Sequence, residues 1–329
     1  MKNSIDIYQL KNFYFDLKLI REIEFEIAYR YKELQMRTPV HLCIGQEATP
    51  VGISANLMPS DKVLSSHRSH GHYIARGGNI DRMIAELYGK LSGCSKGKGG
   101  SQHLVDTSVG FLGSAPILAS TISIGVGVAW ALKQKRSHSV CIVYFGDSAV
   151  EEGIFHESLS FASLHNLPII FVCENNLYST HAPLSSRQPD RPISRTAMAH
   201  NISSFTLDGN NVIEIFEVSK KVIQMARMGF GPSLLVCNTY RWLEHVGPNK
   251  DETLGYRSSE EIQSWREKDP ILHLSKIILS QASNWLNEEM RINLEIKSKI
   301  DNAFSFAIKS PSPAPDQLLA DVYSGVINE

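Results

Sequence analysis

The sequence predicts an α/β fold: a doubly wound, mostly parallel β-sheet with helical additions at the N- and C-terminal ends. Two short apolar runs, Val140–Phe145 and Pro168–Val172, are rich in Val, Ile and Phe. Runs of this kind are typical of strands buried on both faces of a parallel sheet. The segment between them, Glu151–His165, is expected to be the crossover helix that parallel strands require. Helical periodicity before and after this unit predicts the additions.

The N-terminal part is predicted to be mainly helical. An amphipathic helix over residues 8–36 carries apolar side chains at helical spacing, and Thr38-Pro39 ends it. Further helices are expected over 46–57, 80–91 and 120–133. The last of these is rich in small residues and is expected to be close-packed and buried. The Gly-, Lys- and Ser-rich stretch Leu91–His103 is predicted to be a loop.

The C-terminal half adds two strands and a helical end. Strands are expected at Phe205–Leu207 and Ser233–Cys237, on either side of a helix over Val212–Met228. Thr239–Arg257 is long, polar and aperiodic, which predicts a functional or mobile loop. Ser258 is the expected cap of a helix over 260–267, and helices fill 270–308 before a proline-rich tail. Residues 1–329 are expected to form one domain, with an N-terminal helix (8–36) and a C-terminal helical region from about 258 to 329.

Composition limits the class of protein. The chain has 329 residues, 43% of them hydrophobic, which allows a sizeable core. A formal net charge of −1 argues against a general nucleic-acid or membrane-surface binder, and no apolar run approaches a membrane span. Residues 1–8 lack a signal-peptide core, and the five cysteines are scattered without a Cys-x-x-Cys pair. Together these features predict a cytoplasmic protein with reduced, mostly buried cysteines.

Polar residues follow both apolar strands. Gly146-Asp147-Ser148 comes after the first, and Glu174-Asn175-Asn176 comes after the second. If the strands are neighbours, their carboxyl ends lie about 5 Å apart, so Asp147 and Asn176 could each place an oxygen on one hard cation. Mg²⁺ binds few protein oxygens and fills its remaining positions with water and phosphate. The sequence therefore predicts a phosphorylated cofactor held through a metal.

The start of the crossover helix supports this hypothesis. Ser148, Ala149 and Val150 lie where unpaired backbone N–H groups favour an anion. Glu151 and Glu152 would repel a diphosphate if they faced it, so they are expected to point away.

The spacing of these residues resembles the thiamine diphosphate motif, Gly-Asp-Gly followed after some two dozen residues by Asn-Asn. Here 26 residues separate Asp147-Ser148 from Asn175-Asn176. Ser148 replaces the second glycine of the motif, which the site tolerates if only the backbone N–H is needed. The resemblance also implies a third metal ligand, the backbone carbonyl of Tyr178.

The resemblance extends over nearly the whole chain. The sequence is similar to the alpha subunit of the heterotetrameric 2-oxo acid dehydrogenase first component, in the branch of pyruvate and acetoin dehydrogenases. The matching segments are 41–48, 68–72, 93–101, 155–159, 238–241, 255–257 and 315–323. This resemblance implies a thiamine diphosphate-binding fold.

The family pattern implies roles for individual residues. Arg68 would bind the cofactor diphosphate, with His41, His67, Ser148 and Ala149 in the same pocket. His70 and His245 would be catalytic histidines near the substrate and the diphosphate. The backbone around Pro116 and Leu118 would hold the aminopyrimidine ring. Besides Ser148, this chain departs from its relatives at four positions, where His67, Pro116, Leu243 and Val246 stand.

Other motifs in the sequence do not fit their usual functions. His67, His70 and His72 lack the further ligands of a zinc site, so the alternative is surface or loop histidines. Gly93–Gly100 has the wrong spacing for a phosphate-binding loop, and Gly125–Trp130 lacks the third glycine of a dinucleotide fingerprint. Glu47 is interpreted as structural.

The sequence thus predicts an enzyme subunit that holds Mg²⁺ and thiamine diphosphate for oxidative decarboxylation of a 2-oxo acid, with acyl transfer to lipoamide. The resemblance implies a separate beta subunit that supplies the catalytic glutamate, an α₂β₂ assembly, and a lipoyl acyltransferase as acceptor. Two alternatives stay open. One is a two-chain thiamine diphosphate carboligase or decarboxylase without lipoyl transfer, and the other is a non-catalytic scaffold.

Overall fold

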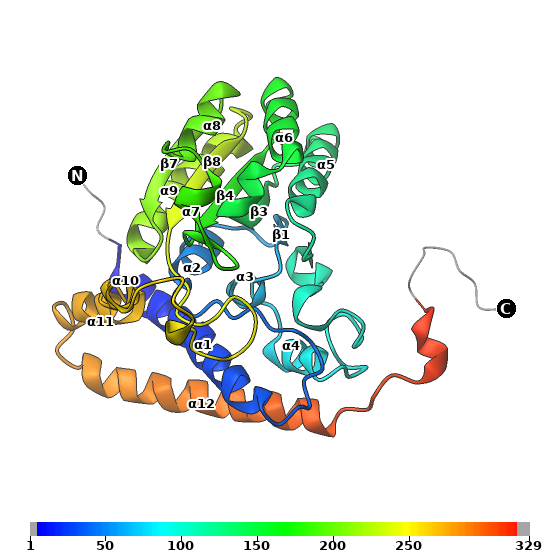
Figure 1. The fold of residues 1–329 in the computed structure, drawn as a ribbon, viewed down its shortest axis with the longest axis vertical. Helices are drawn as coiled ribbons and strands as arrows, with labels where there is room; N and C mark the ends of the chain where they lie inside the picture. The colour runs from blue at the N-terminus through cyan, green and yellow to red at the C-terminus, as the bar shows by residue number, and fades with distance from the viewer. Residues whose placement is uncertain (1–4, 321–329) are drawn as a thin grey trace.

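The structure is a computed structural model that describes residues 5–320. Its centre is a parallel six-stranded sheet with the strand order β2-β1-β3-β4-β8-β7 (Figure 1). The strands are β1 (Lys62–Ser65), β2 (Phe111–Ser114), β3 (Cys141–Gly146), β4 (Ile169–Asn175), β7 (Ser203–Asp208) and β8 (Ser233–Asn238). The predicted α/β fold with a mostly parallel sheet is confirmed, and the two motif strands, β3 and β4, are neighbours.

Side chains of β3 and β4 alternate between two separate cores. Ile142 and Tyr144 belong to one apolar cluster, while Val143 and Phe145 belong to the other. A strand whose two faces are both buried reads as a continuous apolar run, which is why the sequence pattern was informative. The sheet is therefore covered on both faces.

Different helices cover the two faces. One face carries α5 (Ser120–Gln134), α6 (Gly153–Leu164) and α8 (Ser194–Ala199). The other carries α2 (Ala48–Ser54), α3 (His70–Ala75), α4 (Ile80–Leu87) and α9 (Val212–Arg227). Figure 1 shows α5 and α6 side by side along one flank. At Gly125 of α5 an added Cβ would lie 2.2 Å from Val143 Cγ2, so this glycine allows the helix to approach β3 closely.

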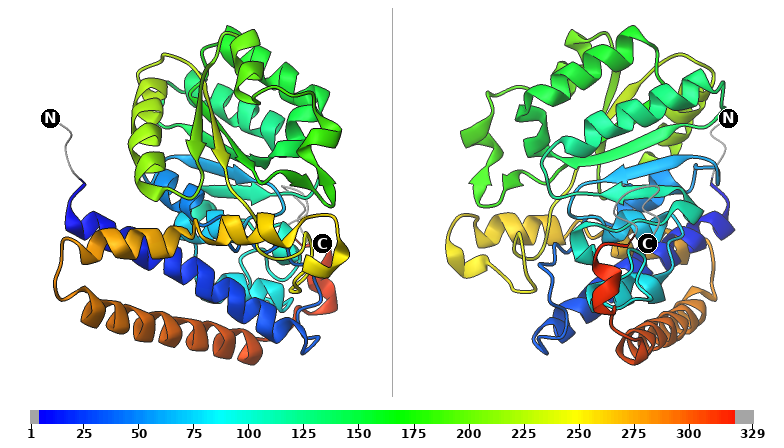
Figure 2. Two further views of the ribbon diagram at one scale, coloured as in Figure 1. Left: turned by 60° about the vertical axis from the view of Figure 1, so that its left-hand side comes forward. Right: turned by 90° about the vertical axis from the view of Figure 1, so that its right-hand side faces the viewer.

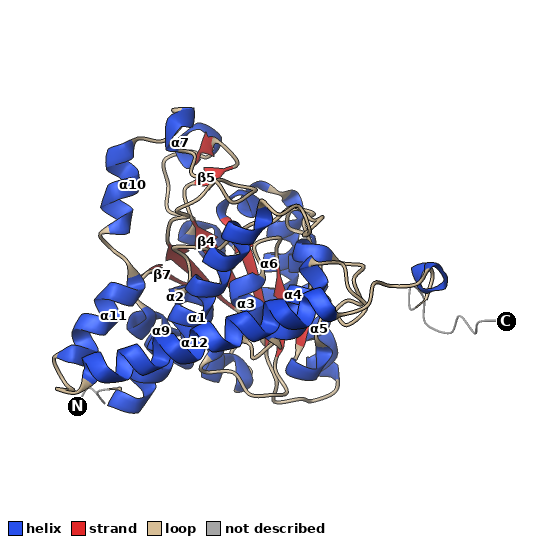
Figure 3. Ribbon diagram, turned by 90° about the horizontal axis from the view of Figure 1, so that it is seen from below, coloured by secondary structure: helices blue, strands red, loops and turns tan. Residues whose placement is uncertain are grey.

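The helical additions form a further layer (Figures 2 and 3). The N-terminal helix α1 (Ile7–Tyr31) packs against α11 (Pro270–Leu279) and α12 (Trp285–Lys309), and α12 also packs against α4. Tyr14 meets the buried Trp285 edge-on, with ring centroids 4.8 Å apart. The remaining helix, α10 (Ser259–Arg266), is capped as predicted by Ser258, whose Oγ accepts from the Glu261 N–H. The assignment of residues 1–329 to one domain stays a prediction.

Several expectations about local structure were wrong. The helix expected over 120–133 is buried on one side only, since Ile124 is 53% exposed. The helices expected over 46–57 and 80–91 are shorter, and the predicted crossover helix begins only at Gly153. Short elements were not predicted at all: β1, β2, α3, α8, the two-stranded ribbon β5 (Tyr178–Ser179) and β6 (Ala182–Pro183), and α7 (Leu184–Arg187). Four-residue strands and one-turn helices are too short to show a period.

Residues 321–323 of the family-like terminal segment lie outside the described residues. Within residues 5–320, every helix is either too short or too polar to cross a lipid bilayer.

Candidate active site

A cavity of about 250 Å³ lies at the carboxyl ends of β3 and β4. Most residues that the sequence pointed to line it: His41, His67, Arg68, Pro116, Leu118, Asp147, Ser148, Asn176, Tyr178 and His245. Two predicted residues, His70 and Ala149, do not line it. The cavity combines residues from the sheet with residues from loops. We call Asp147, Asn176 and Tyr178 the sheet side, and His41, His67 and His245 the loop side.

The sheet side follows from strand register. Gly146 is paired with Glu174, so Asp147 and Asn176 leave the sheet at adjacent positions. Asn176 Oδ1 accepts from the Tyr178 N–H at 3.3 Å, and its Nδ2 donates to Gln46 Oε1 at 3.1 Å. Between them, Leu177 adopts φ +73°, a left-handed conformation that costs a non-glycine residue about 1–2 kcal/mol. Such strain is frequent where backbone must present ligands.

Asp147 already interacts with a cation. Its carboxylate is 2% exposed and forms an ion pair with the Arg187 guanidinium, which also pairs with Glu151. Burial raises the pKa of Asp147, and the pairing with Arg187 only partly offsets this. The guanidinium supplies positive charge at the carboxylate oxygen where a metal ion would bind. A carboxylate, an amide oxygen and a nearby backbone carbonyl form a donor set that suits Mg²⁺.

The segment after β3 differs from the predicted helix start. Asp147–Glu151 forms a short 3-10 turn, and α6 starts only after Glu152, whose backbone is extended. Ser148 reaches the cavity, whereas Ala149 is buried in the apolar core. Glu151 interacts with Arg187 and with Gln188 Nε2, which donates to it at 2.8 Å.

On the loop side, three imidazoles gather around Arg68. The ring centroids of His41 and His67 are 4.5 Å apart, and His245 lies 5.0 Å and 5.5 Å from them. Arg68 is buried and donates to the carbonyls of Leu42, at 2.6 Å, and His245, at 3.2 Å. This cluster of donors is chemically suited to an anion.

Burial sets the charge of these groups. It lowers the pKa of His41 to about 2, with the positive charge of Arg68 adding to the effect. The same two causes lower the pKa values of His67 and His245 to about 3. The three imidazoles are therefore neutral at pH 7. Burial lowers the pKa of Arg68 only to about 10, so its guanidinium keeps its charge.

His70 lies behind the cavity. It is fully buried on α3, where its Nδ1 is 2.5 Å from Glu24 Oε1 and its Nε2 is 2.7 Å from Ser101 Oγ. His72, on the same helix, is stacked on Tyr144. Both are buried helix residues, so the alternative of surface or loop histidines fails for these two, whereas His67 does lie in a loop. The catalytic role of His70 stays a prediction, and its contacts indicate a positioning role.

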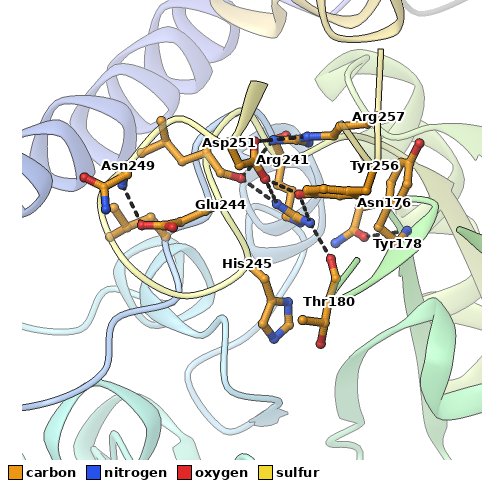
Figure 4. Close-up of polar contacts among 12 residues, drawn as sticks. Asn176, Tyr178, Thr180, Arg241, Glu244, His245, Asn249, Asp251, Tyr256 and Arg257 are labelled. Atoms are coloured by element: carbon orange, nitrogen blue, oxygen red, sulfur yellow. Dashed lines mark hydrogen bonds and ion pairs between the residues drawn. The ribbon is translucent and has the colours of Figure 1, made fainter. Parts of the chain in front are cut away.

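The loop 239–257 is fastened by a buried ionic network (Figure 4). Asp251, 1% exposed, accepts hydrogen bonds from Arg241, Arg257 and Tyr256. Arg241 also donates to the Thr180 carbonyl at 2.7 Å, which ties the loop to the cavity wall. Burial opposes ionisation of Asp251, but the hydrogen bonds and charges around it hold its pKa below the usual value. Arg241 and Arg257 also donate to the Leu243 carbonyl, so the network fixes the backbone two residues before His245, which lines the cavity.

Sequence reasoning missed several lining residues. Gln46, Ser66, Gln102, Glu174, Ser179 and Thr180 also face the cavity. Gln102 Nε2 donates to His41 Nδ1 at 3.1 Å, and buried Gln46 Nε2 has no partner among the described residues. A buried amide without a partner can donate a hydrogen bond to a bound acceptor such as a phosphate oxygen. Of these residues, only Glu174 carried a signal, because it directly precedes Asn175-Asn176.

Two of the residues at which this chain departs from its relatives lie in different places. Leu243 is buried in the core and does not line the cavity, so its side chain leaves the lining unchanged. His67 does line it. Glu47, interpreted as structural, is buried and pairs with Arg21.

The glycine-rich loop 93–100 binds no phosphate through its amides. Buried Glu86 accepts the backbone N–H groups of Ser95, Gly97, Gly99 and Gly100. Those are the donors that a phosphate loop would direct at its ligand, so its rejection agrees with the structure.

Comparison with known proteins gives a consistent result. The family model of the dehydrogenase E1 component matches residues 15–316. The alpha subunit of acetoin:2,6-dichlorophenolindophenol oxidoreductase from Bacillus subtilis is 37% identical over 86% of this chain and 84% of its own length. The pyruvate dehydrogenase E1 component subunit alpha from Rickettsia typhi is 32% identical over 94% of both chains. The testis-specific human form is 35% identical over 93% of this chain and 77% of its own length. The chain therefore belongs to the dehydrogenase E1 component family, in the group of its alpha subunits.

Proposed function

We propose that this chain is the alpha subunit of a thiamine diphosphate-dependent 2-oxo acid dehydrogenase of the pyruvate or acetoin type. The observation that carries the proposal is the cavity itself. It brings an oxygen donor pair, Asp147 and Asn176, within one enclosure of about 250 Å³ together with Arg68. Family membership supports the proposal, and a scaffold would have no need of this donor set.

The residues fit the proposed groups. Asp147, Asn176 and the Tyr178 carbonyl would hold Mg²⁺, with Arg187 displaced from the carboxylate. Arg68, His41, His67, Ser148 and His245 would bind the diphosphate, and the backbone at Pro116 and Leu118 would hold the aminopyrimidine ring. Bound thiamine diphosphate supplies the carbanion chemistry of 2-oxo acid decarboxylation.

A fixed charge that is largely buried acts strongly on a ligand beside it. Arg68 is 5% exposed, so its guanidinium would face the diphosphate with little screening by water. His245 lines the cavity, its carbonyl accepts from Arg68, and its ring would be able to donate a hydrogen bond to a phosphate oxygen or a reacting group. In this proposal His70 is a positioning residue, because its hydrogen bonds with Glu24 and Ser101 fix its ring behind the cavity wall.

A beta subunit would complete the site. Beside the cavity wall, Ile117 is 69% exposed, and on α5 and α6 Ile124 and Phe161 are 53% and 41% exposed. Ile117 stands between two residues that line the cavity, Pro116 and Leu118, and an exposed apolar side chain beside a site is typical of a protein interface. We propose that a beta subunit covers these exposed apolar side chains, supplies the glutamate that activates the cofactor, and gives an α₂β₂ enzyme in the cytoplasm. A lipoyl acyltransferase would accept the acyl group.

The test uses the purified full chain with and without its beta subunit. Calorimetry should show Mg²⁺-dependent thiamine diphosphate binding, and 2-oxo acid decarboxylation should appear only when both subunits are present. Robust turnover by the chain alone would refute the shared site, and absence of cofactor binding in both states would favour a scaffold.

His67 favours one second candidate, a two-chain carboligase or decarboxylase without lipoyl transfer, because it changes the cavity lining. Assays with a lipoyl domain, an artificial electron acceptor or an aldehyde acceptor distinguish the two. Reductive acylation of the lipoyl domain would support the dehydrogenase, and carbon–carbon bond formation without it would support the carboligase.

A further inference from the structure

The loop side of the cavity has the chemistry of a second kind of site. His41, His67 and His245 each offer a ring nitrogen, and these three atoms lie within 4.8 Å of one another. They come from three separate segments of the chain, so no sequence motif joins them. The zinc candidate weighed from sequence, His67 with His70 and His72, does not assemble, because His70 and His72 bind Glu24 and Ser65 instead.

We propose that His41, His67 and His245 bind one transition-metal cation of the Zn²⁺ class, and that the cavity accepts this ion in place of the phosphorylated cofactor. The inference goes beyond the proposed function, because it concerns the chain before any cofactor binds.

The geometry is close to that of a three-histidine site. Zn²⁺ binds imidazole nitrogen at about 2.0–2.1 Å, so tetrahedral ligands lie roughly 3.4 Å apart. Ring nitrogens within 4.8 Å reach that spacing if each ring moves by roughly 1 Å. The fourth position would face the cavity and be open to water.

The three imidazoles are in the protonation state that a metal cation requires. A metal binds the neutral imidazole, and burial keeps all three rings neutral at pH 7. Imidazole selects Zn²⁺, Cu²⁺ and Ni²⁺ over the hard Mg²⁺. Gln102 contacts His41 Nδ1 at 3.1 Å, and with its amide oxygen turned to accept from that nitrogen it would leave His41 Nε2 free as a ligand.

The charge around the cluster is mixed. Arg68 opposes a dication, but its guanidinium is engaged by the Leu42 and His245 carbonyls. Glu174 and Asp147 line the same cavity and provide negative charge. A metal ion here would occupy the space between the imidazoles that the diphosphate would need.

The test is a cobalt titration of the tag-free full chain after treatment with a chelator, without Mg²⁺ or cofactor. Co²⁺ should bind one ion per chain and give the intense visible absorption of a low-coordinate imidazole site. His41→Gln, His67→Gln and His245→Gln should each weaken binding by about tenfold or more, the range seen when even supporting residues of a metal site are lost. The control is His200→Gln, which removes one ring of the His156–His200 pair, 5.8 Å apart, outside the cavity.

Two further measurements keep the test decisive. If a cavity variant fails to fold, Zn²⁺ should still protect His41, His67 and His245 of the unmodified chain from carbethoxylation, read by mass spectrometry. Zn²⁺ at one equivalent should also block Mg²⁺-dependent thiamine diphosphate binding to the unmodified chain, whereas the same concentration of Ca²⁺, a hard cation that imidazole does not select, should not. Absence of the cobalt spectrum, its retention in all three cavity variants, its loss in His200→Gln, or cofactor binding unaffected by Zn²⁺ would each overturn the proposal. The cobalt titration uses no cofactor, so its result is independent of the proposed function.

Discussion

The two sides of the cavity are held in place by different means. On the sheet side, the hydrogen-bond ladder between β3 and β4 fixes the backbone positions from which Asp147 and Asn176 extend. The loop side has no ladder. The Asp251 ionic network fixes the Leu243 carbonyl two residues before His245, and Arg68 donates to the carbonyls of Leu42 and His245. A sheet thus places ligands through its backbone, whereas loops need buried charge to reach the same precision.

The largest expected effect is on the stability of the loop side. Asp251→Asn would leave Arg241 and Arg257 buried without their carboxylate. Breaking a buried ion pair by removing one partner costs about 3–5 kcal/mol, so the free energy of unfolding measured in denaturant should fall by that amount.

The neighbouring residue gives a matched control. Glu252 pairs with Arg266 near the surface, where both side chains are about one-third exposed, at 32% and 29%. Glu252→Gln should cost less than about 1 kcal/mol. Equal losses in the two variants would show that the network does not hold the loop.

The second effect concerns ligand binding at the sheet side. Asp147→Ala should lower Mg²⁺-dependent affinity for thiamine diphosphate by about 100-fold or more, since a metal ligand is lost. The fold should stay intact, because the strand ladder does not involve this side chain. Calorimetry with magnesium as the only metal and a thermal melt measure the two properties.

Glu151→Ala is the matched control, because it removes the other carboxylate on Arg187 and no proposed metal ligand. Its cofactor affinity should stay near that of the unmodified chain. Unchanged affinity in Asp147→Ala would contradict the assignment of the metal site.

The same contrast explains what the sequence could predict. Apolar runs and the spacing of Asp147 and Asn176 indicated β3, β4 and these two residues, because strand ends are placed by local pattern, whereas Tyr178 came from family resemblance. The loop-side residues came from family resemblance. Their convergence, and the partners Gln46, Gln102 and Asp251, depend on contacts between distant segments that have no sequence period. The 3-10 turn that buries Ala149 was missed for a similar reason, since one extended residue, Glu152, interrupts the helix.

The third prediction concerns pH. The folded chain holds His41, His67 and His245 with lowered pKa values, about 2 to 3. In the unfolded chain they titrate near 6.5, so below that pH the unfolded state binds more protons and the folded state loses stability. Without cofactor, the free energy of unfolding should fall by about 1–2 kcal/mol between roughly pH 7 and 5.5, after allowance for partial exposure.

His67→Gln should reduce this acid loss, because Gln does not titrate. Since Asp251 has a lowered pKa, its own stabilising contribution is lost only at lower pH, below its unfolded value near 3.9. Stability that is unchanged down to pH 5.5 would show that the imidazoles are solvated more than the structure indicates.

The smallest expected effect concerns Arg187, whose guanidinium is already paired with Asp147 on the sheet side. Arg187 competes with Mg²⁺ for Asp147, and its side chain is 11% exposed. Arg187→Gln should strengthen Mg²⁺ binding by the chain alone by up to about tenfold, the equivalent of one modest ion pair that no longer has to be broken. Calorimetric titration of Mg²⁺ in the presence of inorganic pyrophosphate measures the change.

Arg191→Gln is the control for net charge. Arg191 is exposed and lies four residues after Arg187, so this substitution removes the same unit of charge without touching Asp147. Only Arg187→Gln should alter Mg²⁺ affinity at a fixed ionic strength. Weaker Mg²⁺ binding in Arg187→Gln would mean that the guanidinium helps to position Asp147 for the metal. The sheet side would then depend on a buried charge as the loop side does, and the contrast between the two sides would be lost.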